Sequence, residues 1–152
     1  MIPPSSVTAS GPHDAQPLLH AGDWQAPRVI AILLHGRGAS ASDILSLAPA
    51  LALPGLAFLA PQAGGHTWYP ASFLAPASVN QAGVDSAHAV IESLLRWLTA
   101  QGFNPSRVVL AGFSQGACLA TDHAFRYPRL YGGIIAFTGG LIGPSDTQFV
   151  PR

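Results

Sequence analysis

Four short apolar runs alternate with longer segments of helical periodicity, and this alternation limits what the chain can fold into. The runs are Val29–Leu34, Leu56–Ala60, Arg107–Ala111 and Gly133–Phe137. Val29–Leu34 contains no polar residue, as expected for a strand that is buried on both faces. Strands that alternate with helices form βαβ units, which build a parallel sheet with helices on both faces. The sequence therefore predicts an α/β fold.

Helix signals fill the segments between these runs. A first helix is predicted to begin at Ser42, and a second is predicted from a cap at Asn80 to Gly102, with apolar residues at i, i+3 and i+4. A third is predicted over Gln115–Tyr127, which a proline follows. The segment Pro61–Ser78 has no clear period but is rich in aromatic residues, which favours a functional loop over a plain connector.

The length of 152 residues fits one domain. Hydrophobic residues make up 49% of the chain and charged residues only 9%, which favours a well-buried core over disorder. Residues 1–16 are rich in Pro, Ser and Gly without periodicity, so they are expected to form a flexible lead-in. Residues 17–152 are expected to form the single domain.

Composition excludes several functions. The net charge is zero, so no basic balance points to nucleic acid. All seven basic residues are Arg, which removes lysine Schiff-base and P-loop chemistry. Cys118 is the only cysteine and the six histidines lack metal-ligand spacing, so neither a disulfide nor a structural metal is expected.

The N-terminus lacks the pattern of a secretory signal, and no apolar run is long enough to span a membrane. We expect a cytoplasmic protein.

One pentapeptide carries the chemistry. Gly112–Gly116 reads G-F-S-Q-G, a G-x-S-x-G motif placed where an apolar strand ends and a helix begins. In this setting a strained turn lifts the serine hydroxyl above the sheet, and the flanking glycines prevent a clash around that turn. The motif alone is weak, and an ordinary strand–turn–helix with a buried serine is the alternative. Its context favours Ser114 as a nucleophile.

A glycine-rich loop upstream fits the same chemistry. His35–Gly38 follows the first buried strand, where an α/β hydrolase places one backbone donor of its oxyanion hole. The other donor is the N–H that follows the nucleophile, here that of Gln115. Backbone N–H groups stabilise the negative charge of a tetrahedral intermediate without side-chain chemistry. His35 as catalytic base is the less favoured reading, because it precedes the serine in the chain.

Together these motifs resemble a known family. The stretches L-L-H-G-R-G-A-S (Leu33–Ser40) and A-G-F-S-Q-G-A (Ala111–Ala117) are similar to the carboxylesterase/lysophospholipase branch of the α/β hydrolases, which includes the acyl-protein thioesterases. Trp68–Pro70, Phe73–Pro76 and the run Tyr127–Gly140 also match it. The resemblance covers roughly residues 18 to 144. It implies a three-layer α/β-hydrolase fold with a mostly parallel sheet.

The resemblance also assigns roles. It implies that Ser114 is the nucleophile and that the backbone N–H groups of Arg37 and Gln115 form the oxyanion hole. It places three aromatic residues at the substrate pocket, although their side chains fit a core equally well: Trp68, Tyr69 and Phe73. The implied substrate is a small carboxylic ester, a lysophospholipid or an acyl thioester, and the chemistry needs no cofactor.

The rest of a catalytic triad is missing. In this fold an Asp or Glu and then a His follow the serine, but only Asp122, His123 and Asp146 do so here. Asp122 and His123 lie eight and nine residues along the helix, about 12–14 Å away. The chain is therefore expected to lack the last strand–helix units of the fold. An apolar edge at Gly133–Phe137 would then be open, and a homodimer could form through it.

Three readings follow. The chain is a serine hydrolase by family that is weak or inactive alone, because loss of triad members leaves only residual catalysis. Alternatively, it is an inactive fragment that binds an apolar ligand or a partner. In the third reading, a second chain supplies the missing Asp and His.

Overall fold

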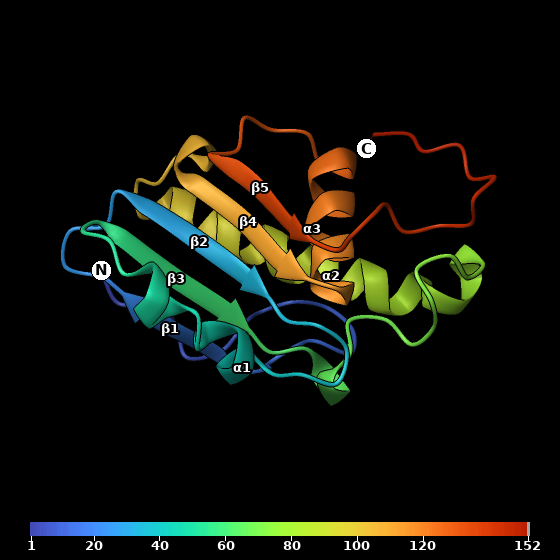
Figure 1. Ribbon diagram of the computed structural model, residues 1–152, viewed down its shortest axis with the longest axis horizontal. Helices are drawn as coiled ribbons and strands as arrows, with labels where there is room; N and C mark the ends of the chain where they lie inside the picture. The colour runs from blue at the N-terminus through green and yellow to red at the C-terminus, as the bar shows by residue number, and fades with distance from the viewer. Residues whose placement is uncertain (152) are drawn as a thin grey trace.

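The computed structural model describes residues 1–151 and shows one five-stranded, mostly parallel sheet (Figure 1). The strand order is β1-β3-β2-β4-β5. The bounds are β1 Leu18–Gly22, β2 Val29–Leu34, β3 Leu56–Pro61, β4 Val108–Phe113 and β5 Gly133–Phe137. All neighbouring strands pair in parallel except β1, which pairs antiparallel with β3. The α/β architecture expected from the alternating pattern is confirmed.

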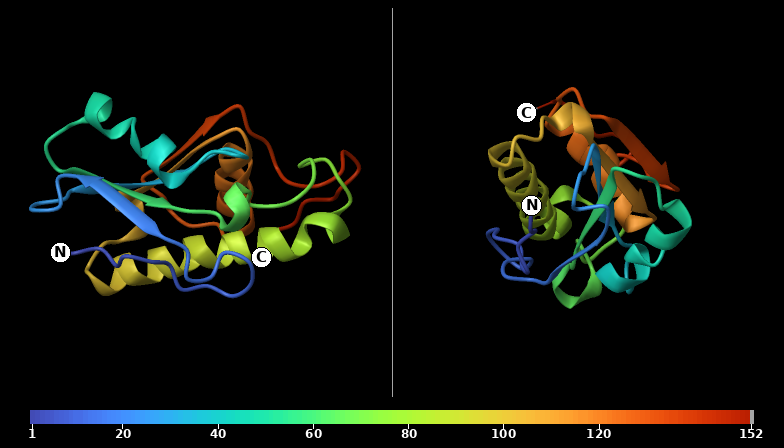
Figure 2. Two further views of the ribbon diagram at one scale, coloured as in Figure 1. Left: turned by 90° about the horizontal axis from the view of Figure 1, so that it is seen from below. Right: turned by 90° about the vertical axis from the view of Figure 1, so that its left-hand side faces the viewer.

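Helices lie on both faces of the sheet, which gives three layers (Figure 2). The α-helices are α1 Ala41–Leu45, α2 Ala77–Ala100 and α3 Gln115–Arg126, and the short 3-10 turns are η1 Ala48–Leu51, η2 Gly64–His66 and η3 Pro105–Arg107. The long helices α2 and α3 share one face, whereas α1 and η1 lie on the other face. Within residues 1–151, no helix combines the length and apolar character needed to cross a bilayer.

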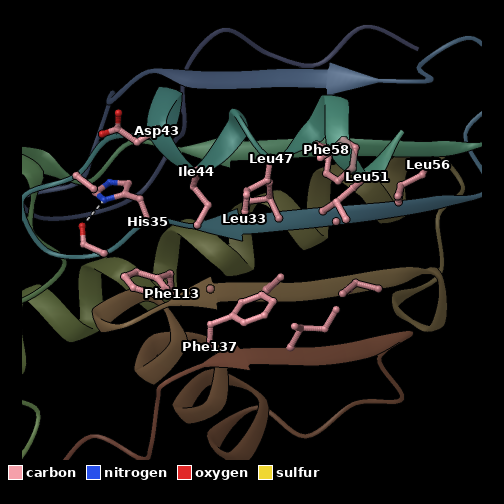
Figure 3. A pocket seen from close by; sticks show the side chains of 18 of the residues that line it. Leu33, His35, Asp43, Ile44, Leu47, Leu51, Leu56, Phe58, Phe113 and Phe137 are labelled. Atoms are coloured by element: carbon pink, nitrogen blue, oxygen red, sulfur yellow. Dashed lines mark hydrogen bonds between the residues drawn. The ribbon is translucent and has the colours of Figure 1, made fainter. Parts of the chain in front are cut away.

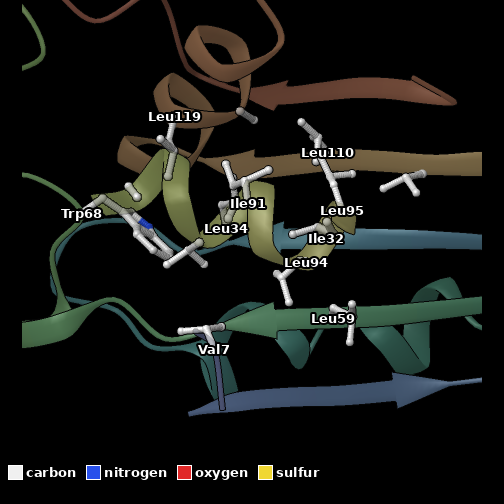
Figure 4. Packing of buried hydrophobic residues seen from close by; sticks show 14 of the residues in the cluster. Val7, Ile32, Leu34, Leu59, Trp68, Ile91, Leu94, Leu95, Leu110 and Leu119 are labelled. Carbon is white, nitrogen blue, oxygen red and sulfur yellow. The ribbon is translucent and has the colours of Figure 1, made fainter. Parts of the chain in front are cut away.

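The larger core lies between the sheet and α2 (Figure 4). Alternate residues of β2 point into it, and Ile30, Ile32 and Leu34 are fully buried against the apolar stripe of α2. The intervening residues Ala31 and Leu33 point to the opposite face, into a smaller cluster with α1. This division follows from the two-residue period of a strand, and it explains why β2 has no polar residue.

Several local features differ from the sequence prediction, among them β4, which runs from Val108 to Phe113 rather than from Arg107 to Ala111. Strand β1 was not predicted, because it buries only Leu18 of its five residues and shows no alternating apolar pattern. The second helix begins at Ala77 rather than after Asn80, whose side chain instead bonds the backbone of Ala71 and Ser72. The first helix is capped by Ser40 and ends at Leu45, and the following turn is a separate 3-10 element with Pro49 near its start.

The N-terminal segment packs on the domain, unlike the flexible lead-in expected for residues 1–16. Val7 and His13 are almost fully buried. The ring of His13 bridges two other segments, because Nδ1 accepts from the N–H of Gly64 at 3.0 Å while Nε2 lies 2.9 Å from the carbonyl oxygen of Trp68. A composition rich in Pro, Ser and Gly does not reveal these contacts, since they depend on segments more than 50 residues away.

Replacing His13 with alanine should destabilise the fold, because it leaves buried backbone groups of Gly64 and Trp68 without partners. Each such group costs about 1–3 kcal/mol, so we expect a loss of roughly 2–6 kcal/mol in the free energy of unfolding, measured by urea titration. Thr8→Ala is the matched control, since Thr8 is exposed in the same segment. A loss for His13→Ala as small as that for Thr8→Ala would contradict the packing.

Candidate active site

Ser114 occupies a strained turn between β4 and α3. Its φ of 52° and ψ of −114° lie in a region that non-glycine residues rarely adopt. The backbone N–H of Ser114 donates to the carbonyl oxygen of Phe137 at 2.9 Å, which ties the turn to the end of β5. The residue itself is exposed. The turn therefore presents the serine to solvent, as the G-x-S-x-G motif predicts for a nucleophile.

Two glycines make this turn possible. A methyl group on Gly116 would overlap the carbonyl groups of Leu34 and His35, at the end of β2. A methyl group on Gly112 would overlap the backbone of Gly116 itself. The first turn of α3 thus rests directly on the backbone of the sheet, and only glycine allows so close an approach.

The glycine-rich loop after β2 lies beside the serine. A Cβ placed on Gly36 would be 3.7 Å from Cβ of Ser114. No backbone carbonyl within residues 1–151 accepts the N–H of Arg37 or of Gln115. Both of the donors predicted for an oxyanion hole are therefore free of backbone partners, one in the loop and one at the start of α3.

The side chain of Gln115 connects these parts, a role that the sequence analysis did not assign. Its Oε1 accepts from the N–H of Trp68 at 2.8 Å, and its Nε2 donates to the carbonyl oxygen of Tyr69 at 2.8 Å. The side chain is nearly buried. A glutamine can satisfy a donor and an acceptor of one backbone segment at once, so the segment 67–71 is fastened to the first residue of α3.

The guanidinium group of Arg37 fastens the same segment to the glycine-rich loop. It donates to the carbonyl oxygens of Pro70 at 2.7 Å and Ala71 at 2.6 Å. Nε1 of Trp68 adds a bond to the carbonyl oxygen of His35 at 2.9 Å. Segment 67–71 is therefore a strap across the site: it holds the loop and the serine turn in one arrangement.

This strap changes the reading of the three aromatic residues. The sequence left Trp68 and Tyr69 open between the border of a substrate pocket and the core, and the structure buries both in the core, with exposed fractions of 0% and 2%. Their side chains thus present no surface to a substrate. Phe73 is partly buried against the same core. The sequence cannot separate these alternatives, because a buried aromatic anchor and a pocket wall have the same composition.

Every histidine ring that forms a hydrogen bond in the described residues forms it with a group other than Ser114. The ring of His35 is buried: Nε2 accepts from the N–H of Ala63 at 3.0 Å, so Nδ1 carries the proton toward the carbonyl oxygen of Gly36 at 2.8 Å. Burial lowers the pKa of His35, which keeps the ring neutral. Within residues 1–151, no imidazole bonds the hydroxyl of Ser114. His35 supports the loop through its backbone contacts instead.

Asp122 and His123 lie in a buried polar cluster between α2 and α3. His88 bridges them: its Nε2 lies 3.0 Å from Oδ2 of Asp122, and its Nδ1 lies 3.0 Å from Nδ1 of His123. Nε2 of His123 lies 3.0 Å from Oε1 of Glu92. In the described part of the chain, no group of three His, Cys, Asp or Glu side chains is arranged to hold a metal. The cluster links two helices and has no bond to Ser114.

Burial and pairing shift the titration of this cluster. Burial lowers the pKa of His123 to about 4, despite the opposing effect of Glu92. For Glu92, burial alone would raise the pKa, but the neighbouring imidazole of His123 and the hydrogen bonds from Arg129 outweigh it and lower the pKa to about 2. Near neutral pH, His123 is therefore neutral while Glu92 is ionised.

A strained, exposed serine at a strand-to-helix turn, facing a glycine-rich loop on a mostly parallel sheet, defines the α/β-hydrolase class. The sequence matches the phospholipase/carboxylesterase family over residues 21–150. The chain belongs to this family.

Solved structures and curated proteins support this family assignment. A phospholipase/carboxylesterase from Dyadobacter fermentans superposes with a TM-score of 0.82 at 42% identity, over 95% of this chain and 67% of that chain. Acyl-protein thioesterase 1 of Eremothecium gossypii is 30% identical over 139 residues, and that of Kluyveromyces lactis is 29% identical over 136 residues. These matches cover 81% and 78% of this chain. The chain spans about 60% of the length of the two thioesterases.

Gly116→Ala should disrupt the turn, because the added methyl overlaps backbone that cannot move without displacing β2. We expect a loss of about 3 kcal/mol or more in the free energy of unfolding, at or above the usual range for overpacking. Gly133→Ala, where the nearest atom to the new methyl lies 3.7 Å away on Val109, should change stability by about 0.5 kcal/mol or less. Equal effects of the two substitutions in urea titrations would contradict the close contact.

Acidification should begin to destabilise the fold at pH values well above those at which ordinary carboxylates titrate. The folded pKa of His123 is lowered to about 4 from 6.5, so the unfolded chain takes up this proton first as the pH falls. Stability is then lost progressively between pH 6.5 and 4, and Glu92 continues the loss from 4.5 toward 2. Urea midpoints at pH 7, 6, 5 and 4 measure this slope. His123→Gln should reduce this slope without removing it, because burial also lowers the pKa of His13 and of His35. A midpoint constant down to pH 4 in the unaltered chain would refute the assignment.

Proposed function

We propose that this chain carries the nucleophile and the oxyanion hole of a serine hydrolase that cleaves carboxylic esters or acyl thioesters. The observation that carries the proposal is the strained, exposed Ser114 beside two backbone N–H groups that no carbonyl engages. Membership of the phospholipase/carboxylesterase family supports it. The names of the two curated thioesterases extend the substrate class to acyl thioesters.

The chemistry follows from these groups. Oγ of Ser114 attacks the carbonyl carbon of the substrate, and the carbonyl π electrons move onto its oxygen. The N–H groups of Arg37 and Gln115 donate to this oxyanion, which stabilises the transition state more than the ground state. The serine proton passes to a base, the intermediate expels its alkoxide or thiolate, and water then hydrolyses the acyl-serine. Within residues 1–151 no side chain is placed as that base, so the proton passes to solvent and the reaction is slow.

A fluorophosphonate probe tests the nucleophile. We expect the 152-residue chain to gain one adduct slowly, on Ser114, as seen by intact-mass spectrometry and peptide mapping. Hydrolysis of 4-nitrophenyl acetate should be measurable but far below the usual kcat range of roughly 1–10³ s⁻¹. Ser114→Ala should abolish both signals, whereas Ser78→Ala, an exposed residue at the start of α2, should leave them unchanged.

Two outcomes would overturn the proposal. If the adduct and the hydrolysis persist in Ser114→Ala, then another residue is responsible. If neither is detectable in the unaltered chain while its circular dichroism shows a folded protein, then the serine is not a nucleophile here. A kcat within the usual enzyme range would contradict the slow transfer to solvent and indicate a base supplied by another chain.

A further inference from the structure

The loop that carries Arg37 is supported by the 3-10 turn η2. The carbonyl oxygen of His66 accepts the N–H of Gly38 at 2.8 Å, and Nδ1 of His66 lies 2.9 Å from the carbonyl oxygen of Ala39. His66 therefore contacts both residues that follow Arg37. Its own φ of 59° is one that non-glycine residues rarely adopt, and Gly65 before it has a φ of 61°. A turn of this kind persists only where the surrounding contacts hold it.

The imidazole of His13 holds η2 at both ends. Its Nδ1 accepts from the N–H of Gly64 at 3.0 Å, where the turn begins, and its Nε2 lies 2.9 Å from the carbonyl oxygen of Trp68, just beyond the end. Because Nδ1 accepts, the ring is the neutral tautomer in which Nε2 carries the proton. A methyl group on Gly64 would overlap the carbonyl oxygen of Pro12, so the N-terminal segment lies directly against η2. One side chain thus spans the whole turn.

The position of His13 is itself fixed by the core. Its N–H donates to Oγ of Ser86 on α2 at 3.0 Å, and both residues are almost fully buried. The ring also contacts the buried indole of Trp68 edge to face, with the ring centroids 5.2 Å apart. The carboxylate next to Ser86 in the chain, that of Asp85, is exposed and accepts from Gln81 at 2.8 Å. His13 therefore joins α2 to the turn that supports the glycine-rich loop.

Trp68 extends the same contact to the other oxyanion donor. Its carbonyl oxygen accepts from His13, while its N–H donates to Oε1 of Gln115 at 2.8 Å. The two peptide groups on either side of one α-carbon therefore connect His13 to the first residue of α3. Both backbone N–H groups of the oxyanion hole are thus linked to one imidazole, that of Arg37 through His66 and that of Gln115 through Trp68.

We propose that neutral His13 is a positioning residue for the oxyanion hole, and that acid loosens the hole by protonating this ring. The inference rests on the proposed function, because the two N–H groups act in catalysis only if they bind an oxyanion. The family match begins at residue 21, so it does not include His13. An imidazolium carries a proton on both nitrogens, so its Nδ1 would meet the N–H of Gly64 donor to donor. The bond at Gly64 is then lost, while the bond to Trp68 is kept.

The surroundings of His13 favour its neutral form near neutral pH. Burial lowers the pKa of the ring, despite the opposing effect of the backbone of Trp68 and Gly83. Asp14, the next residue, bonds the N–H of Ala9 rather than the ring. In the described part of the chain, no carboxylate pairs with His13. The ring therefore takes up its proton below 6.5, the ordinary pKa of a histidine.

His35 is the second imidazole that holds this turn. Its Nε2 accepts from the N–H of Ala63 at 3.0 Å, next to the amide that His13 holds. Its charged form is opposed by His13 and His66 and favoured by Asp43. Figure 3 shows Asp43 and His35 at the same end of the apolar pocket on the α1 side of the sheet. Because His35 is unchanged in every His13 variant, comparing variants at one pH cancels its contribution.

Two amide side chains divide the contacts of His13. In His13→Gln the amide nitrogen lies three bonds from Cβ, as Nε2 does, so it donates to Trp68 but leaves Gly64 without an acceptor, as an imidazolium would. In His13→Asn the amide oxygen lies two bonds from Cβ, as Nδ1 does, so it accepts from Gly64 at every pH. The matched control is His20→Asn, which replaces an exposed histidine on β1.

Amide hydrogen exchange and fluorophosphonate labelling of the 152-residue chain test the two parts of the proposal. At pH 7, His13→Gln should lower the protection of the Gly64 and Gly38 amides about tenfold and label Ser114 at least about threefold more slowly. As the pH falls to 4.5, the unaltered chain should converge with His13→Gln in both measurements. His13→Asn should keep the protection of Gly64 over this range, and His20→Asn should follow the unaltered chain.

Three results would overturn the inference. His13→Gln could protect Gly64 and Gly38 as well as the unaltered chain does, or it could lose this protection and still label Ser114 at the unaltered rate, which would limit His13 to a role in stability. The third is a ratio of the two labelling rates that stays constant from pH 7 to 4.5. If circular dichroism shows that His13→Gln is unfolded, the loss of Gly64 protection with acid in the unaltered chain but not in His13→Asn decides instead. A folded, unaltered chain without any labelling refutes the proposed function, and exchange at Gly38 then still shows whether His13 holds the loop.

Discussion

The close approach of α3 to the sheet backbone is the contact on which the rest of the site depends. Gly116 rests on the carbonyl end of β2, and Gly112 allows the chain to turn back over it. This contact forces Ser114 into a conformation that costs about 1–3 kcal/mol. The bond from its N–H to Phe137 and the burial of the first turn of α3 hold it there. The exposure of the serine is thus a product of the packing beneath it.

Around this turn, side-chain hydrogen bonds hold the neighbouring segments in a fixed arrangement. Gln115 and Arg37 both bind the strap 67–71, so it links the loop to the serine turn. Each bond contributes only about 1 kcal/mol net, but breaking one in a buried position costs about 1–3 kcal/mol. A preorganised pair of backbone donors is what stabilisation of an oxyanion requires, because donors already in place need no reorganisation during the reaction.

The two faces of the sheet give the chain two different properties. The face under α2 and α3 is a closed core. The face under α1 leaves β4 and β5 open, although the same strands contribute to both. Alternation along a strand supplies apolar residues to both faces whether or not a helix covers them. The open face is therefore a consequence of strands that the closed core also needs.

The sequence by itself determined the α/β class, the bounds of β2 and β5, and the position of Ser114 at a strand-to-helix turn, because hydrophobic period and glycine spacing are local signals. Only the tertiary structure decided which residues build around that turn. Trp68 and Tyr69 form a buried strap, His13 fastens the N-terminal segment, and Gln115 connects strap to helix. The hydrogen bonds of Gln115 and His13 join residues that are 46 to 55 positions apart in the chain. No local pattern encodes such a partner, since a hydrogen bond across the fold depends on where the packed elements finally lie.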